Sequence, residues 1–353
     1  MRILLLFGLL LPVAALKAQA TDPDSTATSI DRFIKARADA DSFSGAVLVA
    51  RNGIPILRAA YGLSDREKRT PITPETKFNL GSIDKLITRI AIWQLVAAGK
   101  IDLDKPIGTY LPDYPNGAVR DKVTARQLYN MSSGVGDFFN EEFQRRHESI
   151  RTIDDYLSLF ATAPLQFEPG TSRMYSNGGY VILGKLIERL TGMTYYDYVR
   201  ASITERAGMT DTRHFFIDDR VHNRAIGYTR MRGTLASNTA TIAGRGSPAG
   251  GGYSTVDDFL KLDRALRSGA LIAGNFADSI LTAGFRSASG EPLVYGGGAP
   301  GTNTQYVAFA DGLTIIVFAN ADPPSATRVA EGIAKAFGKS LPGGTRMIRR
   351  PGG

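Results

Sequence analysis

The chain has 353 residues, of which 43% are hydrophobic, and a formal net charge of +8. It contains no cysteine, which excludes a disulfide framework, thiol catalysis, a zinc–thiolate site and a lipid-attached lipoprotein signal. Aromatic residues do not interleave with a basic stripe, so we interpret the positive charge as solvation or attraction to anionic surfaces and expect no nucleic-acid partner.

Residues 1–20 have the features of a cleavable signal peptide. Arg2 provides the positive end, residues 3–16 form an apolar run, and the segment from Ala18 to Ala20 is an A-x-A cleavage site. The run is shorter than the roughly 20 residues of a transmembrane helix, although an uncleaved anchor is the alternative. We therefore predict cleavage after Ala20, export to the periplasm or the medium, and no membrane span in the mature chain.

Two β-hairpins, one near each end of the chain, are predicted from their turn residues. Asn-Gly at positions 52–53 and Asp-Gly at positions 311–312 are typical two-residue turns between β-like runs. An amphipathic helix is expected outside each hairpin. The same elements in opposite order at the two ends predict one antiparallel sheet assembled from both termini. The runs are residues 45–50, 54–59, 305–310 and 313–318, and the helices are residues 25–38 and 325–337.

The middle of the chain shows helical spacing of apolar residues at 124–131, 152–161, 179–190 and 195–207, and a capping pattern at Thr255 opens a further helix. Helices inserted into an antiparallel sheet make an α+β fold. We predict a single catalytic domain with a ligand cleft between its two parts. Its α/β part is about 21–80 and 250–340, its mainly helical part is about 81–249, and a basic tail follows at 341–353.

The central motif of the chain is Ser82 followed three residues later by Lys85. Apolar residues at three- and four-residue spacings from Ile83 to Val96 predict a helix, with Ser82 as its N-cap or first-turn residue. Side chains three positions apart lie on the same face of a helix, so the Lys85 amine is expected to reach the Ser82 hydroxyl. This is the geometry that a serine nucleophile needs.

Lys85 has apolar neighbours in the sequence, and two interpretations of it are open. A serine hydroxyl is a weak nucleophile until a base takes its proton, and a lysine can be that base when burial favours the neutral amine. Alternatively, Lys85 is a surface residue whose aliphatic stem covers an apolar helix face. A Ser-x-x-Lys match also arises by chance about once in a chain of this length, so the motif has meaning only together with others.

A second polar group, Tyr175-Ser176-Asn177, directly precedes the helix predicted at 179–190. A tyrosine there can act as a general base or proton shuttle, and an asparagine amide can both donate to and accept from an ester or amide substrate. The simpler interpretation is that Tyr175 is a loop aromatic residue and that Asn177 is a helix N-cap.

A glycine-rich segment at 295–303 precedes the C-terminal hairpin. Glycines let a strand edge approach a ligand closely and direct backbone N–H groups toward it. The segment formally contains G-x-G-x-x-G, but no helix follows it and Pro300 interrupts it, so we do not interpret it as a dinucleotide-binding loop. Its first residues are Tyr295, Gly296, Gly297 and Gly298.

Taken together and in this order, the motifs resemble those of the serine β-lactamase and penicillin-binding-protein superfamily, specifically its class C-like branch. Ser82-x-x-Lys85 matches the first motif, Tyr175 to Asn177 matches the Y-x-N second motif, and Tyr295 begins the segment in the place of the third. The branch also holds esterases, D-aminopeptidases and D,D-carboxypeptidases. The resemblance covers nearly the whole mature chain and includes residues 99–106, 132–134, 208–212 and 249–255.

The resemblance implies a fold, an activity and a set of roles. The fold would be β-lactamase/transpeptidase-like, and the protein would be an acyl-enzyme hydrolase without a cofactor, acting on a small-molecule or peptide-like acyl substrate. Ser82 would be acylated, Lys85 would be the neutral amine that shares its proton, and Tyr175 would protonate the leaving group and later activate water. Asn177 would hold the acyl side of the substrate.

The third motif is expected to contact the substrate through Tyr295, Gly297 and Gly298, with the backbone N–H groups of Ser82 and Gly298 forming the oxyanion hole. The family usually has Lys or His where this chain has Tyr295. Without that Lys or His, the site lacks a cation that would pair with the carboxylate of a β-lactam or of a peptide ending in D-alanine. We therefore expect esterase or D-aminopeptidase-type activity in preference to strong penicillinase or carboxypeptidase activity.

Two alternatives are kept beside this expectation. One is a class C-like β-lactamase or D,D-carboxypeptidase, and the other is a penicillin-binding or sensor-type module that is acylated without turnover. The histidines, His147, His214 and His222, are scattered without metal-binding spacing. We therefore expect no metal and no catalytic histidine, and place His214 in a loop that packs under the helical part. The oligomeric state is left open.

Overall fold

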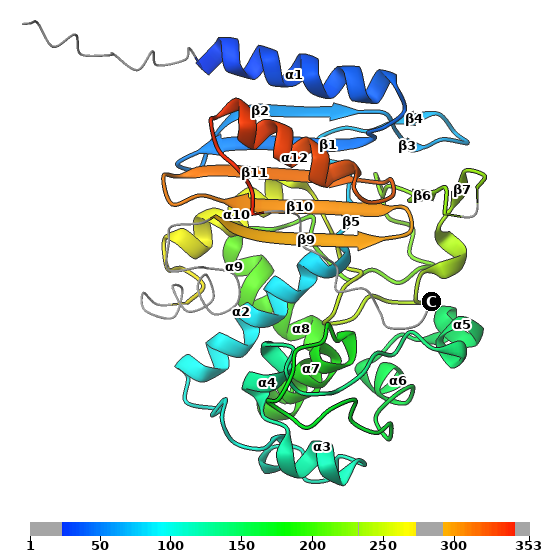
Figure 1. Cartoon of the computed structure of the whole chain (residues 1–353), viewed down its shortest axis with the longest axis vertical. Coiled ribbons are helices and arrows are strands. Elements are labelled where there is room, and N and C mark those ends of the chain that lie inside the picture. The colour runs from blue at the N-terminus through cyan, green and yellow to red at the C-terminus, as the bar shows by residue number, and fades with distance from the viewer. Residues whose placement is uncertain (1–22, 232, 273–291, 343–353) are drawn as a thin grey trace, which may run out of the picture.

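The computed structural model describes residues 23–231, 233–272 and 292–342 (Figure 1). The predicted signal peptide at 1–20 and most of the basic tail at 341–353 lie outside the described residues. Within these ranges, strands from both ends of the chain form a sheet, and a mainly helical part lies below it in the view of Figure 1. The prediction of an α+β fold is therefore confirmed.

A five-stranded antiparallel sheet has the strand order β2-β1-β11-β10-β9. Because β1 of the N-terminal hairpin pairs directly with β11 of the C-terminal hairpin, Leu48 lies opposite Ile316. The sheet is thus assembled from both termini, as predicted, and β9 forms one of its edges. The strands are β1 (Gly45–Arg51), β2 (Ile54–Tyr61), β9 (Leu293–Ala299), β10 (Thr302–Ala308) and β11 (Leu313–Ala319).

The N-terminal hairpin turn adopts the two-residue conformation that its residues predict, since Asn52 and Gly53 have φ values of +51° and +76°. Positive φ angles at both central residues match the twist of the flanking strands. The C-terminal turn differs from the prediction: the Phe309 N–H donates to the Leu313 carbonyl (2.8 Å), so the turn has three residues, 310–312, and Gly312 supplies its positive φ of +86°. The main difference from the expectation is that β10 begins at Thr302 rather than at residue 305, so the glycine-rich segment is itself a strand, β9, joined to β10 by a tight turn.

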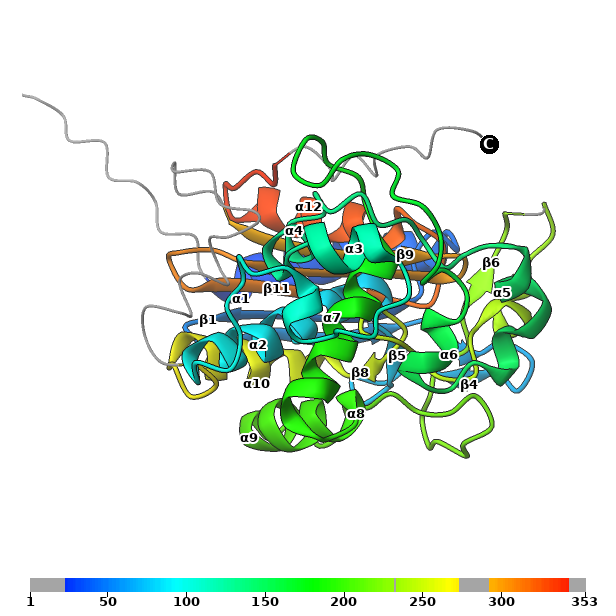
Figure 2. The same cartoon turned by 90° about the horizontal axis from the view of Figure 1, so that it is seen from below.

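The described helices fill the space around and below this sheet (Figures 1 and 2). The α-helices are α1 (Pro23–Asp39), α2 (Asp84–Ala97), α3 (Gly117–Lys122), α4 (Ala125–Tyr129), α5 (Glu141–Arg146), α6 (Ile153–Leu157), α7 (Asn177–Thr191), α8 (Tyr195–Val199), α9 (Glu205–Ala207), α10 (Val256–Arg267) and α12 (Ser325–Ala336). The short strands are β3 (Leu63–Asp65), β4 (Thr70–Pro71), β5 (Phe78–Asn79), β6 (Tyr228–Thr229), β7 (Ala236–Ser237) and β8 (Tyr253–Ser254).

The two faces of the sheet belong to two different hydrophobic cores. Val47 and Val317 point into the core that α1 and α12 cover, together with Ile333 of α12. Leu48 and Ile316 point into the larger core, which contains α2, α7 and α10. This alternation along β1 and β11 follows from the two-residue period of a strand, and burial on both faces explains why these strands are almost entirely apolar.

The helical part is organised around α7, which packs against α2, α4, α6 and α8 and runs through the middle of this part in Figure 2. Its segment from Tyr180 to Ile187 is buried except for Lys185, as expected for a helix surrounded by others. Two expected helices differ from the prediction. The helix expected at 152–161 ends at Leu157, and the one expected at 195–207 is interrupted by a π-helical turn, Arg200–Thr204.

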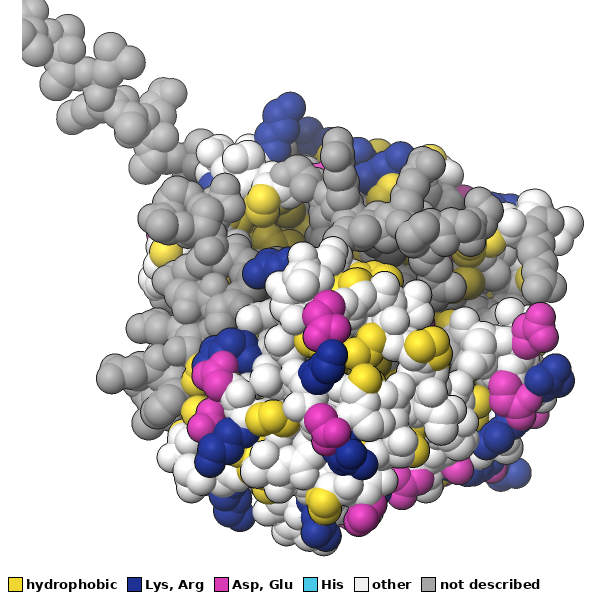
Figure 3. Space-filling model, turned by 60° about the horizontal axis from the view of Figure 1, so that its bottom comes forward, with side chains coloured by type: hydrophobic (Ala, Val, Ile, Leu, Met, Phe, Trp, Pro, Cys, Tyr) yellow, Lys and Arg dark blue, Asp and Glu magenta, His cyan; other side chains and the backbone are white. Residues whose placement is uncertain are grey.

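Basic and acidic side chains lie side by side on the lower face of the molecule (Figure 3). Among the described residues, exposed pairs of this kind include Arg126 with Asp104 (2.6 Å) and Lys122 with Glu168 (3.0 Å). The positive charge on this face is therefore offset locally by carboxylates. Within the described ranges, we find no helix with both the length and the apolarity needed to cross a bilayer.

Candidate active site

Ser82 lies in a 3₁₀ turn, Gly81–Ile83, between β5 and α2; this segment is called the Ser82 turn below. Because α2 begins only at Asp84, Ser82 precedes the helix instead of capping it, which corrects the prediction. The turn is held by its neighbours: the Gly81 N–H donates to the Asn79 side chain (2.9 Å), and Gly81 has a φ value of +52° that favours glycine.

The structure brings the side chains of Ser82, Lys85 and Tyr175 together. The Ser82 Oγ and the Tyr175 hydroxyl form a hydrogen bond in which either can be the donor, and the Lys85 Nζ lies 3.2 Å from the Ser82 Oγ. Lys85 is only 3% exposed, whereas Tyr175 is 39% exposed. Three groups from α2, the Ser82 turn and the loop before α7 thus meet at a place that is open on the tyrosine side.

Lys85 is a buried residue, so its interpretation as a surface lysine is wrong. Its Nζ donates to the Asn177 Oδ1 (2.8 Å) and to the carbonyl oxygen of Ala249 (2.5 Å). The rings of Tyr175 and Tyr180 lie beside the amine, with centroids 4.8 Å and 5.3 Å from Nζ. In the neutral form, Lys85 can keep the bonds to Asn177 and Ala249 and turn its lone pair toward the Ser82 hydroxyl.

Asn177 is the first residue of α7, and Ser176 is the N-cap, which corrects the simpler reading of Asn177 as the cap. The Ser176 Oγ accepts from the Gly179 N–H (2.8 Å). The Asn177 side chain is therefore available for other contacts: its Oδ1 faces Lys85, and its Nδ2 donates to the Asp137 Oδ2 (2.8 Å). The second motif thus connects the lysine to a carboxylate on the loop before α5.

β9 passes the Ser82 turn so closely that position 297 has room only for glycine. A Cβ atom on Gly297 would overlap the Leu80 carbonyl oxygen and the Thr304 hydroxyl, and it would come within 3.0 Å of the Ser82 nitrogen. Thr304 of β10 also donates to the Leu80 carbonyl (2.7 Å). The backbone of Gly298 is next to the same turn, since a Cβ atom added to Gly81 would lie 3.2 Å from the Gly298 nitrogen.

Replacing Gly297 with alanine is expected to lower the free energy of unfolding by about 1–3 kcal/mol, the usual cost of overpacking. It is also expected to lower kcat/KM at least about tenfold, because β9 moves away from the Ser82 turn. Gly296→Ala is the matched control, since its added Cβ would meet only the end of the flexible Gln305 side chain. Denaturant melts and an ester assay measure both effects, and equal losses in the two variants would contradict this packing argument.

Tyr295 is placed differently from the expectation, because its side chain is 5% exposed and belongs to the larger core. Its hydroxyl accepts from the Arg89 Nη1 (3.4 Å). Arg89, itself 3% exposed, also donates to the Tyr180 hydroxyl (2.7 Å) and to the Tyr129 carbonyl (3.0 Å). The structure therefore does not present the Tyr295 ring to a substrate, and it places a cation behind that ring.

Burial raises the pKa of Tyr180 to about 12, and the adjacent Arg89 guanidinium partly opposes this rise. Tyr180 therefore stays protonated at neutral pH, so its hydroxyl can accept from Arg89 and donate to the Tyr129 carbonyl (3.2 Å). Arg89 is a residue that the sequence analysis missed; its signal was a second basic residue one helical turn after Lys85.

His214 has the packing role that was expected. It is buried between the rings of Tyr195 and Tyr196, and its Nε2 lies 3.4 Å from a carboxylate oxygen of Asp84. Asp84, two residues after Ser82, accepts from the Gly252 N–H, which ties the segment carrying the Ala249 carbonyl to the start of α2. The residues that the structure describes contain no group of His, Asp and Glu side chains that could hold a metal ion.

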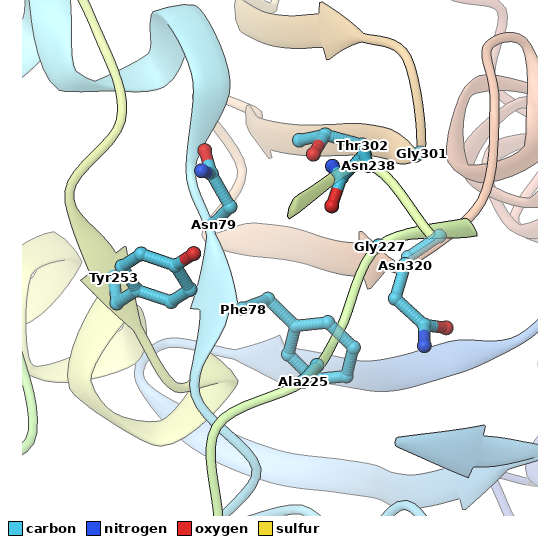
Figure 4. A pocket seen from close by; sticks show the side chains of 10 residues that line it. Phe78, Asn79, Ala225, Gly227, Asn238, Tyr253, Gly301, Thr302 and Asn320 are labelled. Atoms are coloured by element: carbon cyan, nitrogen blue, oxygen red, sulfur yellow. The ribbon is translucent and has the colours of Figure 1, made fainter. Parts of the chain in front are cut away.

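A cavity behind the Ser82 turn is too small to be the substrate site. The labelled side chains around it in Figure 4 include Asn79, Tyr253 and Asn320. Its volume is about 10 Å³, which is about the space that one water molecule occupies. We therefore expect an acyl substrate to reach Ser82 from the side where Tyr175 is exposed.

The chain is similar to known proteins over most of its length. The family model described as Beta-lactamase matches residues 30–337. Penicillin-binding protein 4* of Bacillus subtilis is 26% identical over 309 residues, which cover 78% of this chain and 67% of that protein. Esterase EstB of Burkholderia gladioli is 34% identical over 215 residues, which cover 54% of this chain and 55% of the esterase.

Among solved structures, a penicillin binding protein from Bacillus halodurans has a TM-score of 0.76 and 28% sequence identity, with 86% of this chain and 99% of that chain covered. The family match spans most of the chain, and the fold agrees with it. The chain belongs to the Beta-lactamase family, in the class C-like branch of the serine β-lactamase and penicillin-binding-protein superfamily, and it is a serine hydrolase.

Proposed function

We propose that this protein is an exported hydrolase that forms an acyl-enzyme on Ser82 and acts on uncharged esters or amides. The observation that carries the proposal is the meeting of the Ser82 Oγ with the Lys85 amine and the Tyr175 hydroxyl. A nucleophile that contacts both a buried amine and a partly exposed phenol has the partners that acyl transfer needs. Export is proposed from the signal-like residues 1–20.

Acylation would begin when the neutral Lys85 amine takes the Ser82 proton and the Ser82 Oγ attacks the carbonyl carbon. The bond to the leaving group then breaks as Tyr175 donates its proton to the departing oxygen or nitrogen, and the proton held on Lys85 returns to Tyr175. In deacylation, Tyr175 passes its proton to the neutral Lys85 and takes a proton from a water molecule, which attacks the ester carbon. The bond to the Ser82 oxygen breaks as Tyr175 gives that oxygen a proton, and the proton held on Lys85 returns to Tyr175. Proton transfers of this kind typically contribute about 10²–10⁴-fold each.

The negative charge that develops on the carbonyl oxygen would be stabilised by the backbone N–H groups of Ser82 and Gly298. These two residues lie on backbone segments that are in contact, and β9 is an edge strand, so alternate N–H groups of β9 point away from β10. The loss of one such donor typically costs about 10²–10³-fold in rate.

The preference for uncharged substrates is proposed from the third motif. The Tyr295 ring occupies the first position of the motif and is buried, and the cation behind it, Arg89, is enclosed by tyrosine side chains. A substrate carboxylate therefore finds no accessible cation at this position to pair with. The match to an esterase supports the same preference.

We expect kcat/KM for p-nitrophenyl butyrate to exceed that for nitrocefin at least about tenfold. Nitrocefin carries a carboxylate that finds no cation at the third motif, and a hydrogen bond to a charged group is usually worth about this factor. Both rates are measured on the mature chain, and the background rate of the Ser82→Ala variant is subtracted from each. Faster nitrocefin turnover would contradict the proposal in favour of a β-lactamase. Stable labelling by a fluorescent penicillin without turnover of either compound would contradict it in favour of a penicillin-binding or sensor module.

A further inference from the structure

We propose that a second cavity, beside the first turn of α2, binds a small hydroxycarboxylate such as lactate. Its volume is about 150 Å³, and the residues that line it include Asp84, Tyr196, His214 and Arg245; it is called the His214 cavity below. None of the three catalytic side chains lines it. A cavity of about this volume holds a molecule of about six non-hydrogen atoms, such as benzene. The inference goes beyond the proposed function, because it does not depend on which acyl group Ser82 transfers.

Arg245 provides a cation that stacks on aromatic rings. Its guanidinium carbon lies 3.5 Å from the centroid of the Tyr196 ring and 4.5 Å from that of the Phe216 ring, and its Nε donates to the His214 carbonyl (2.9 Å). Within the described part of the chain, its two Nη groups have no hydrogen-bond acceptor, and no carboxylate forms an ion pair with it. A stacked guanidinium presents its N–H groups at its edge, where they match the two oxygens of a carboxylate.

Two buried polar atoms beside this cavity, the Asp84 Oδ1 and the His214 Nε2, have no hydrogen-bond partner among the residues that the structure describes. Asp84 is 0% exposed, and its other oxygen accepts from the Gly252 N–H. The His214 Nε2 lies 3.4 Å from that second oxygen, which is long for a hydrogen bond. Buried polar atoms in proteins are nearly always hydrogen-bonded, so a ligand that bonds to both atoms would be favoured.

A hydroxyl group fits these two atoms better than an ammonium group does. A hydroxyl can donate to the Asp84 carboxylate and accept from the His214 ring at once, whereas an ammonium group can only donate. His214 also joins the two binding groups, because its carbonyl accepts from Arg245 and its ring nitrogen lies beside Asp84. The guanidinium and the carboxylate are therefore about one residue apart. In lactate the carboxylate and the hydroxyl are on adjacent carbons, so that one molecule can contact both.

The charges that line the cavity favour a ligand with a net negative charge. Arg200 and Asp197 pair with each other (3.3 Å), which leaves Arg213 and Arg245 against the single carboxylate of Asp84. Burial lowers the pKa of Arg245, so the protein compensates its charge only in part. A monoanionic hydroxycarboxylate adds the missing negative charge, and a zwitterion does not.

The test measures binding to the wild-type protein by isothermal titration calorimetry at neutral pH and constant ionic strength. The ligands are both enantiomers of lactate, propionate, alanine and inorganic phosphate. We expect one lactate enantiomer to bind with a Kd of about 1 mM or lower, the value that two hydrogen bonds to charged groups provide. Propionate lacks the hydroxyl and is expected to bind at least about tenfold more weakly.

Variants of Arg245 locate the site. Arg245→Met keeps a long side chain against the rings but removes the guanidinium, and it is expected to weaken lactate binding at least about tenfold. Arg245→Lys keeps the charge without the bidentate edge and should lie between the two. Arg151→Met is the matched control, because Arg151 also lies over the Phe216 ring (5.2 Å) but is paired with Asp218 (2.9 Å) and does not line the cavity; binding should stay unchanged.

Asp84→Asn tests the contact with the hydroxyl. The asparagine oxygen can still accept from the Gly252 N–H, and the amide nitrogen then replaces the oxygen that lacks a partner. Lactate and propionate are expected to bind this variant within about twofold of each other. An unchanged preference for lactate would overturn the assignment of Asp84 as the acceptor.

The comparison of ligands on the wild-type protein does not depend on the folding of any variant. No lactate binding below about 10 mM, or equal binding of lactate and propionate, would overturn the inference. Tighter binding of alanine or phosphate than of lactate would overturn the ligand class, and full lactate binding by a folded Arg245→Met variant would place the ligand elsewhere. Because binding is measured without turnover, none of these outcomes bears on the proposed hydrolase activity.

Discussion

Ser82→Ala is expected to lower kcat for p-nitrophenyl butyrate by about 10⁴- to 10⁶-fold, the range seen when a covalent nucleophile is removed. The reason is structural: alanine keeps the Ser82 turn, because the backbone contacts that hold the turn do not involve the hydroxyl, but no oxygen remains to form the acyl bond. Lys85 and Tyr175 would still face each other across the missing hydroxyl.

The measurement combines a steady-state assay with covalent labelling. A fluorophosphonate probe should label the wild-type chain once, on the peptide that contains Ser82, and should not label the variant. Ser149→Ala is the matched control, because the Ser149 Oγ is exposed and donates only to the carbonyl of Arg146 (2.8 Å). Labelling of the Ser82→Ala variant at another serine would show that the nucleophile lies elsewhere.

Tyr175→Phe is expected to lower kcat by about 10²–10⁴-fold, the contribution of one general acid–base group. Phenylalanine preserves the ring that lies beside the Lys85 amine (4.8 Å), so the change removes the hydroxyl that contacts the Ser82 Oγ and little else. The loss should depend on the leaving group, because p-nitrophenolate departs without a proton whereas an aliphatic alkoxide does not.

The test therefore uses a p-nitrophenyl ester and an ethyl ester of the same acid. The ratio of wild-type to Tyr175→Phe rates in single-turnover acylation should be at least about tenfold larger for the ethyl ester. Tyr198→Phe is the control, since its hydroxyl donates to the side chain of Gln94, near the C-terminal end of α2 (3.1 Å). A ratio that is the same for both esters would exclude Tyr175 as the acid for the leaving group.

Much of the fold was predictable because its signals are local. Asn52-Gly53 and Asp311-Gly312 indicate their turns through residue chemistry alone, and α7 is marked by its apolar spacing. The 3₁₀ turn at Ser82 was not predictable in this way, because it is set by contacts with Gly297 of β9 and with Gly252. These contacts join parts of the chain that are distant in sequence.

The same distinction applies to the site. Ser82 and Lys85 are three residues apart, and the 3₁₀ turn leads directly into α2, so their proximity follows from local helical geometry. The contacts of Arg89 with Tyr295 and of Asp137 with Asn177 cross between elements, and no periodicity indicates them. The burial of Tyr295 likewise depends on which face of β9 packs against the core, which a segment rich in glycine does not specify in its sequence.

The pairing of β1 with β11 has a consequence for when activity can arise during synthesis. Two elements that pack against the Ser82 turn, β9 and β10, follow it by about 200 residues, and the central strand β11 that aligns them comes later still. A nascent chain that already contains Ser82 and Lys85 still lacks β9 and β10, the strands against which the Ser82 turn packs. Such long-range pairing also slows folding, so the hydrolase acquires its acyl-transfer centre only once residues 293–319 have been synthesised.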